Sequence, residues 1–215
     1  MLEPIRISIK CALELILDPW EQIHSELTEK IEAESTVHLV DVSAFYGTDI
    51  KHYCMVLGHV TNCHIICAHI WPKLTMGKGL SALGLDRSDV NSPRNFLRLH
   101  KSIERAFDKK RLCFSYNMEG GDIRFVVSIL DPDLLQETYE ADGNTVSFSQ
   151  LDNLPCHYKF VPPAKPFVRL IAVHAIKALE NAQALGWVDA GEIPARRQRA
   201  LDLARLSIDP LTLNI

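Results

Sequence analysis

The fold of this chain is decided between Tyr53 and Phe114. This segment begins with the apolar run YCMVLG (53–58), and a second run, IICAHIWP (65–72), follows a short polar stretch. After a loop come NFLRLH (95–100) and KSIERAFD (101–108). Short apolar runs bounded by turn residues predict strands, and apolar residues three and four apart predict a helix. The order predicts strands, a loop, a turn led by an asparagine, and a short helix.

Composition and charge narrow the class of protein. The chain has 215 residues, 47% of them hydrophobic, which is enough for a substantial core. The net charge of −4 excludes a broadly basic nucleic-acid binder, so any nucleic-acid contact would rely on a local patch or a metal ion. Charges interrupt Met1–Leu17, so it is no secretory signal, and no apolar run has membrane-spanning length. We expect an intracellular protein without a membrane partner.

The six cysteines show no CxxC spacing, which argues against a four-cysteine zinc site. Cys63 and Cys67 lie close to His64 and His69, so a mixed Cys/His metal site stays open. The alternative is that these cysteines are small buried residues in a reducing compartment.

The chain before the organising segment, residues 1–52, is expected to support it. Asp18-Pro19 places a capping residue and a proline at a helix start, and the apolar spacing after them predicts a helix over 19–34. A strand is expected at 37–42, and a turn or short helical link at 44–51.

Residues 117–160 are expected to add a β-hairpin and short elements to the 53–116 core. The pattern predicts strands at 111–116 and 123–130 joined by the turn EGGD (119–122). The other expected elements are a helix at 78–85 within the loop, a helix at 131–140 and a strand at 145–148.

The C-terminal part, 161–215, is expected to be helical. A proline-rich connector (155–166) leads into a predicted helix at 167–186, which Gly186 ends. A second helix is predicted at 191–207. Whether these helices form a separate unit stays open at this point. The second helix carries four arginines, which form either a solvated face or a phosphate-contacting surface: Arg196, Arg197, Arg199 and Arg205.

The chemistry-capable residues fall in the organising segment in a fixed order. His69 is placed at a strand end, where an imidazole can act as a general base near neutral pH. Glu104 and Asp108 are four residues apart on the predicted helix, so both carboxylates share one face and can hold a hard divalent cation. The Asn95 amide can orient the histidine or the substrate. Each residue also has a structural alternative: a packed histidine, exposed helix charges paired with Lys101 or Arg105, and a turn asparagine.

These motifs resemble the HNH endonuclease family. Its fungal and oomycete branch has the patterns C-x-V-T-G, A-H-I-x-P, N-G-L-L-L and H-R-x-F-D, and the segments here are CMVLG (54–58), AHIWP (68–72), NFLRL (95–99) and ERAFD (104–108). The layout is also similar to the HNH-type C-terminal domains of Crinkler effectors, which pathogens deliver into host nuclei. The resemblance covers about 53–116 and implies an α+β fold: a ββα-metal core with flanking helices and an additional β-hairpin.

Function and site residues follow from this resemblance. It implies a DNA endonuclease, with His69 as general base, Asn95 orienting, and Glu104 and Asp108 as metal ligands. Glu104 stands where the family usually has histidine, which favours Mg²⁺ or Mn²⁺ over Zn²⁺. Phe96 replaces the usual glycine, Ala68 stands where other HNH branches have a metal-binding Asp or His, and His100 is a further candidate ligand. Arg94, Arg98, Lys101 and Arg105 are candidate phosphate contacts.

Three hypotheses are therefore carried forward. The first is a metal-dependent endonuclease with double-stranded DNA favoured over single-stranded, for which the resemblance to effector domains implies a virulence role in the host nucleus. The second is a degenerate HNH fold that binds DNA or a host protein without catalysis. The third is an interaction protein without a nucleic-acid role. A homodimer stays open as well, and Lys109-Lys110-Arg111 fits phosphate contact as well as nuclear import.

Overall fold

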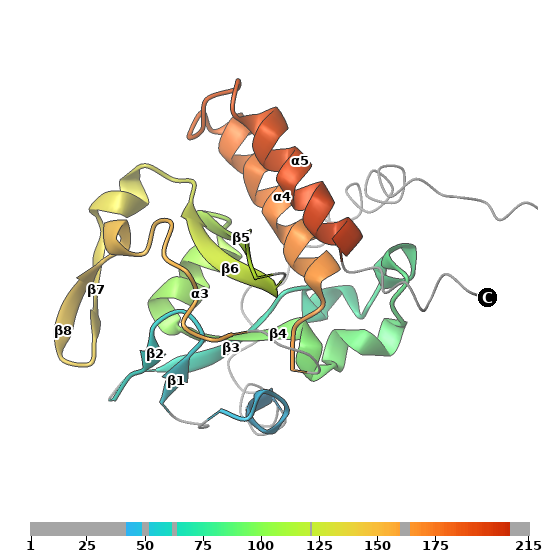
Figure 1. The fold of residues 1–215 in the computed structure, drawn as a ribbon, viewed down its shortest axis with the longest axis horizontal. Coiled ribbons are helices and arrows are strands. Elements are labelled where there is room, and N and C mark those ends of the chain that lie inside the picture. Colours follow the sequence, from blue (N-terminus) through green and yellow to red (C-terminus); the bar gives the residue numbers. More distant parts are fainter. Residues whose placement is uncertain (1–41, 49–51, 62–63, 121, 160–163, 207–215) are drawn as a thin grey trace, which may run out of the picture.

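A computed structural model of the protein describes residues 42–48, 52–61, 64–120, 122–159 and 164–206, and it shows an α+β fold (Figure 1). Its strands are β1 (Tyr53–Cys54), β2 (Gly58–His59), β3 (Ile65–His69), β4 (Phe96–His100), β5 (Leu112–Glu119), β6 (Asp122–Ile129), β7 (Thr138–Ala141) and β8 (Asn144–Ser147). The named helices are α3 (Lys101–Asp108), α4 (Val168–Ala184) and α5 (Ile193–Leu206). The strands pair as four antiparallel hairpins: β1-β2, β3-β4, β5-β6 and β7-β8.

The β3-β4 hairpin and helix α3 form the ββα unit that the organising segment predicts. The two strands pair in register from Ile65 opposite His100 to His69 opposite Phe96. The chain then enters α3 directly, because the His100 imidazole caps the helix: its Nδ1 accepts a hydrogen bond from the Ser102 N–H at 3.3 Å. The loop between the strands, expected to be helical at 78–85, contains short 3-10 turns, one of them at Leu80–Leu83.

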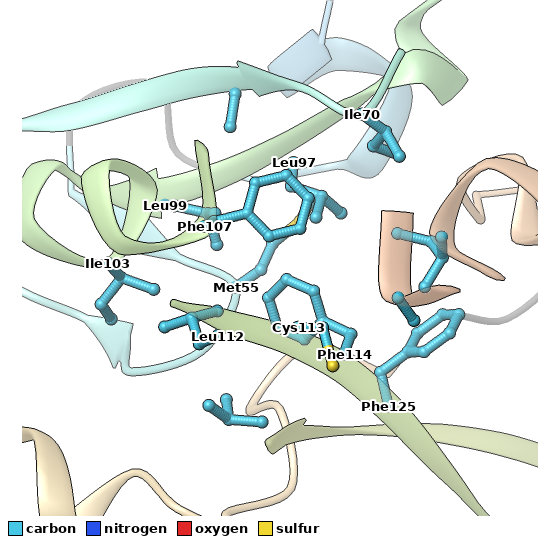
Figure 2. Packing of buried hydrophobic residues seen from close by; sticks show 14 of the residues in the cluster. Met55, Ile70, Leu97, Leu99, Ile103, Phe107, Leu112, Cys113, Phe114 and Phe125 are labelled. Carbon is cyan, nitrogen blue, oxygen red and sulfur yellow. The ribbon is translucent and has the colours of Figure 1, made fainter. Parts of the chain in front are cut away.

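Helix α3 packs one face of this hairpin into the core. Ile103 and Phe107 are four residues apart and both are buried. In Figure 2 the Phe107 ring lies beside Leu97 and Leu99 of β4, with Met55 near it, and Ile103 lies beside Leu112. Successive strand residues point to opposite faces, so the residues between these leucines lie on the other side of β4.

The other face of the hairpin is covered by the N-terminal segment 42–48. Its residues 42–46 are helical, which agrees with the helical link expected near 44–51 but not with a strand reaching Val42. The Tyr46 hydroxyl donates to the Phe96 carbonyl at 3.2 Å. The helix expected at 19–34, and the rest of the strand expected at 37–42, lie outside the described residues.

The connector after β8 returns along the core instead of leaving it. The Cys156 N–H donates to the Phe125 carbonyl at 2.8 Å, and the Tyr158 N–H donates to the Met55 carbonyl at 3.0 Å. The extended connector predicted for 155–166 is confirmed over its described part. The connector thus bonds both to β6 and to Met55, the residue that follows β1, so the β5-β6 hairpin and the ββα unit share one core.

The prediction of a helix at 131–140 is wrong for the second half of that segment. A 3-10 turn occupies Asp133–Gln136, and strand β7 begins at Thr138. Arg111 explains the change, because it holds Asp131 through its Nε at 2.5 Å and Glu137 through its Nη2 at 2.6 Å. These two ion pairs fix both ends of the turn, and the buried ring of Tyr139 then fits a strand that pairs with β8.

The two C-terminal helices agree with the predictions for 167–186 and 191–207, and Gly186 ends the first with a φ of 70°. They do not form a separate unit. In Figure 1, α4 and α5 lie beside β5 and β6. His174 of α4 stacks on Phe107 of α3, with ring centroids 3.6 Å apart, and its Nε2 lies 3.0 Å from the Phe107 carbonyl oxygen. No described helix is long and apolar enough to cross a membrane.

The buried His174 predicts an acid-sensitive fold. Burial lowers the pKa of His174 to about 3, below its ordinary value of 6.5. As the pH falls below 6.5, His174 becomes protonated in the unfolded chain but stays neutral in the folded protein. The free energy of unfolding therefore decreases by about 1.4 kcal/mol per pH unit down to about pH 3. We expect His174→Gln, which keeps an amide donor but does not titrate, to remove this slope. Urea unfolding of both proteins at several pH values checks it, and equal slopes would contradict it.

Candidate metal and nuclease site

His69 is the last residue of β3 and lies half-buried at the strand end. Its ring packs on the Phe96 ring, with centroids 4.1 Å apart and planes tilted by 52°. Phe96 stands where the family pattern has glycine, so this aromatic contact is a local feature of the chain. Residues directly opposite in an antiparallel pair share a face, so the contact follows from the register. It limits the rotation of the imidazole while leaving part of the side chain at the surface.

The side chain and carbonyl of Asn95 form hydrogen bonds with the backbone of the residues just after His69. Its Oδ1 accepts from the Trp71 N–H at 2.7 Å, and its Nδ2 donates to the Trp71 carbonyl at 2.9 Å and to the Val90 carbonyl at 2.8 Å. Its own carbonyl accepts from the Ile70 N–H at 2.8 Å. The side chain is completely buried. Asn95 therefore fixes the backbone of the two residues that follow His69, and its amide bonds to backbone groups and not to the imidazole.

Glu104 and Asp108 come together on one side of α3, as their spacing predicts. The two carboxyl groups lie close enough to each other to interact electrostatically. Desolvation raises the pKa of Glu104, and desolvation together with repulsion from Glu104 raises the pKa of Asp108. The Asp108 side chain nevertheless keeps an exposed edge. The structure thus presents two adjacent oxygen donors that a cation can reach.

His100 is not brought into this pair. Its Nδ1 caps α3, and its ring packs on Tyr139 with centroids 5.0 Å apart. Within the part of the chain that the structure describes, no three His, Cys, Asp or Glu side chains gather closely enough to hold a metal ion. The mixed Cys/His site is not seen there either, and one of its members, Cys63, lies outside the described residues. Among the described residues, the carboxyl pair on α3 remains the candidate cation site.

The carboxyl pair fits a hard divalent cation as two of its ligands. Carboxylate oxygens suit Mg²⁺ or Mn²⁺, and Mg²⁺ sites in proteins commonly keep several water ligands beside one or two carboxylates. Neutralising two like charges held in contact would also remove the repulsion that now raises their pKa values. A soft Zn²⁺ site is not favoured, because no thiolate or imidazole joins the pair among the described residues.

The four candidate phosphate contacts divide into two pairs. Arg98 is completely buried and its Nη1 donates to Thr48 Oγ1 at 2.7 Å, so the expectation that it contacts phosphate is corrected. It points to the face of β4 that segment 42–48 covers. Arg94 is half-buried, donates to the Lys165 carbonyl at 3.1 Å and stacks over the Phe167 ring. Lys101 and Arg105 are exposed and flank Glu104 on α3.

Two residues that shape the site were not predicted from the sequence. Trp71 supplies both the N–H and the carbonyl that Asn95 binds, and His174 stacks on Phe107 in the C-terminal turn of α3. Trp71 lies in the motif itself and could have been noticed. His174 lies 67 residues from its partner Phe107, and nothing in the local pattern signals that contact.

The comparisons with known proteins agree with this geometry. The family model described as HNH endonuclease matches residues 54–115, which is less than half of the chain. No curated protein and no solved structure matches the chain. The matched residues include β3, β4 and α3, with His69, Asn95 and the carboxyl pair at the positions described above. Over residues 54–115 the chain is similar to the HNH endonucleases, and this similarity implies nuclease chemistry in general.

Proposed function

We propose that residues 54–115 form a divalent-metal-dependent endonuclease that hydrolyses phosphodiester bonds of DNA, with double-stranded DNA as the preferred substrate. The observation that carries this proposal is the adjacent pair of carboxyl groups on α3, Glu104 and Asp108, within a ββα unit whose first strand ends in His69. The match to the HNH endonuclease model supports it.

Each residue has a separate task in this proposal. His69 takes a proton from the attacking water, because imidazole is the side chain best suited to that step near neutral pH. Asn95 holds the strand end in place through Trp71, so the imidazole meets the water in one orientation. Glu104 and Asp108 hold the cation. A bound Mg²⁺ or Mn²⁺ supplies stabilisation of the negative charge that develops on the scissile phosphate.

Removing either carboxylate tests the cation site. We expect Glu104→Gln and Asp108→Asn each to lower plasmid nicking in Mn²⁺ at least about tenfold and to raise the Mn²⁺ concentration needed for half-maximal rate, because one charged ligand is lost. Glu119→Gln is the matched control, since Glu119 lies at the far end of β5 and pairs with Arg124. Equal rates for all three variants and the wild type would exclude the pair as the cation site.

The exposed basic residues on α3 are expected to contact the DNA backbone. Each phosphate contact contributes about 0.9 to the slope of log affinity against log salt. We therefore expect Lys101→Gln and Arg105→Gln each to weaken binding and to reduce that slope by about one. Arg205→Gln on α5, which is exposed and pairs with Asp202, should leave the slope unchanged. Fluorescence anisotropy over a series of KCl concentrations measures it, and an unchanged slope in the α3 variants would place the DNA elsewhere.

The second candidate function is a binding module that has lost catalysis. Two observations favour it: no three-donor metal cluster forms among the described residues, and Glu104 replaces the histidine that the family usually has, while Ala68 stands where other branches have a metal-binding Asp or His. This candidate predicts a gel shift of DNA at low salt without any nicking in Mg²⁺ or Mn²⁺. A host protein as the bound partner belongs to the same proposal.

The biological setting is a further part of the proposal. The resemblance to the HNH domains of Crinkler effectors supports a virulence protein that acts on host nuclear DNA. A fluorescent fusion of this chain expressed in host cells tests this setting. Accumulation in the nucleus agrees with it, and exclusion from the nucleus contradicts it.

A further inference from the structure

A cavity of about 220 Å³ lies outside the nuclease site, between the β5-β6 hairpin and helices α4 and α5. Its apolar walls include Phe114 and Ile129 from the hairpin, Ala175 and Leu179 from α4, and Ala200 and Leu203 from α5. The alanines Ala175 and Ala200 leave space where larger side chains would close the helices onto the sheet. In Figure 1 the same helices lie against β5 and β6, away from β3.

Two guanidinium groups stand at this cavity. Arg199 is held there: its Nη2 donates to the Tyr116 carbonyl at 2.7 Å and to Asn117 Oδ1 at 3.3 Å. These bonds use only one of its three nitrogens, so further donors remain for a ligand. Arg196 pairs with Glu192 at 2.7 Å, and the two side chains are 39% and 55% exposed. An exposed ion pair of this kind contributes only about 0–1 kcal/mol, so a ligand anion can replace Glu192.

The negative groups of the cavity are already engaged. Asp152 accepts a hydrogen bond from the Ile129 N–H at 2.9 Å on Oδ1, and from Asn153 Nδ2 at 3.0 Å on Oδ2. Burial raises the pKa of the Cys113 thiol to about 12, so this wall residue is uncharged near neutral pH. The cavity therefore combines apolar walls with two guanidinium groups, Arg196 and Arg199, and one carboxylate, Asp152, whose two oxygens already accept hydrogen bonds.

We propose that this cavity binds a small organic anion with a compact apolar body, such as an aromatic carboxylate, whose anionic group lies on Arg196 and Arg199. An apolar cavity with a few convergent polar groups is the usual form of a small-molecule site. The cavity is smaller than the roughly 300–1,000 Å³ of sites for drug-sized ligands, which restricts the occupant to about the size of one ring. Guanidinium groups are the donors best matched to carboxylates.

The probe is benzoate, titrated into the full chain and followed by the amide resonances of the cavity residues. Benzyl alcohol has the same ring without the charge, and acetate has the charge without the ring. We expect benzoate to give saturable shifts and to bind at least about tenfold more tightly than either control. Binding of benzyl alcohol as tight as that of benzoate, or no saturable shift with benzoate, would overturn the proposal.

Two variants and a matched control locate the site. We expect Arg196→Gln to weaken benzoate binding about tenfold, since it removes a charge-assisted hydrogen bond. Arg197→Gln is the control: it is the next residue on α5, pairs with Glu180 and does not line the cavity. Ala200→Leu should abolish binding by filling the cavity. An equal loss in the Arg196 and Arg197 variants would overturn the proposal. The test measures binding and not cleavage, so its result is independent of the nuclease proposal.

Discussion

His69→Ala is expected to lower plasmid nicking by at least about a hundredfold. A positioned general base contributes roughly 10²–10⁴ to the rate, and alanine leaves no group at this place that can take the proton from water. The imidazole lies at the end of β3, and its packing on Phe96 holds it in one orientation. Initial rates with supercoiled plasmid in Mn²⁺ measure the effect.

His59→Ala is the matched control for this result. His59 is exposed in β2, packs edge-on against Tyr53 with centroids 5.1 Å apart, and lies within the same matched segment. We expect it to keep nearly the wild-type rate. Far-UV circular dichroism of both variants shows whether the fold is retained. Nicking that survives in His69→Ala at the wild-type rate would remove His69 from the mechanism.

Asn95→Ala is expected to destabilise the protein by about 3–5 kcal/mol. The substitution leaves three buried backbone groups without their partner: the N–H and the carbonyl of Trp71, and the carbonyl of Val90. Each unsatisfied buried group costs about 1–3 kcal/mol. The loss falls on the turn that follows His69, so activity should fall even in the fraction that stays folded. Urea unfolding measures the stability.

Asn91→Ala is the control for the loss of stability expected in Asn95→Ala. Asn91 lies four residues earlier in the same loop and is exposed, so its substitution should change the unfolding free energy by less than about 0.5 kcal/mol. Similar small losses for both variants would show that the buried hydrogen bonds of Asn95 do not hold the loop. A stable Asn95→Ala protein without activity would instead make Asn95 a residue of the chemistry itself.

The ββα unit could be predicted because its signals are local. The apolar run before His69, the turn at Asn95 and the spacing of Ile103 and Phe107 each act over a few residues. The carboxyl pair follows from the same helical spacing. The β5-β6 hairpin, with its glycine turn, is also set by neighbouring residues and agrees with the structure.

The burial of Arg98 could not be predicted, because it depends on which segment covers the second face of the β3-β4 hairpin. Strand alternation places Arg98 opposite to the leucines beside it, which in an open hairpin would expose it to solvent. Here segment 42–48 covers that face, and Thr48 binds the guanidinium. The link between α4 and α3 through His174 is of the same kind, since it joins residues far apart in the sequence. The cavity beside α5 also depends on how distant elements pack.

The turn at 131–137 shows how tertiary contacts overrule a local pattern. Asp131-Pro132 is a sound helix start, and a helix to 140 was expected from it. Arg111 binds Asp131 and Glu137 together, which closes the segment into a single turn. Thr138–Ala141 can then pair with Asn144–Ser147 as a hairpin.

The most direct test of the central claim is nicking of supercoiled plasmid by the purified wild-type chain. The protein is first treated with EDTA, and Mn²⁺ or Mg²⁺ is then added back. If residues 54–115 are a metal-dependent endonuclease, EDTA abolishes nicking and the added cation restores it, while the doubly substituted Glu104→Gln, Asp108→Asn protein stays inactive throughout. Nicking that persists in EDTA, or no nicking in either cation by a folded protein that still shifts DNA in a gel, would contradict the claim.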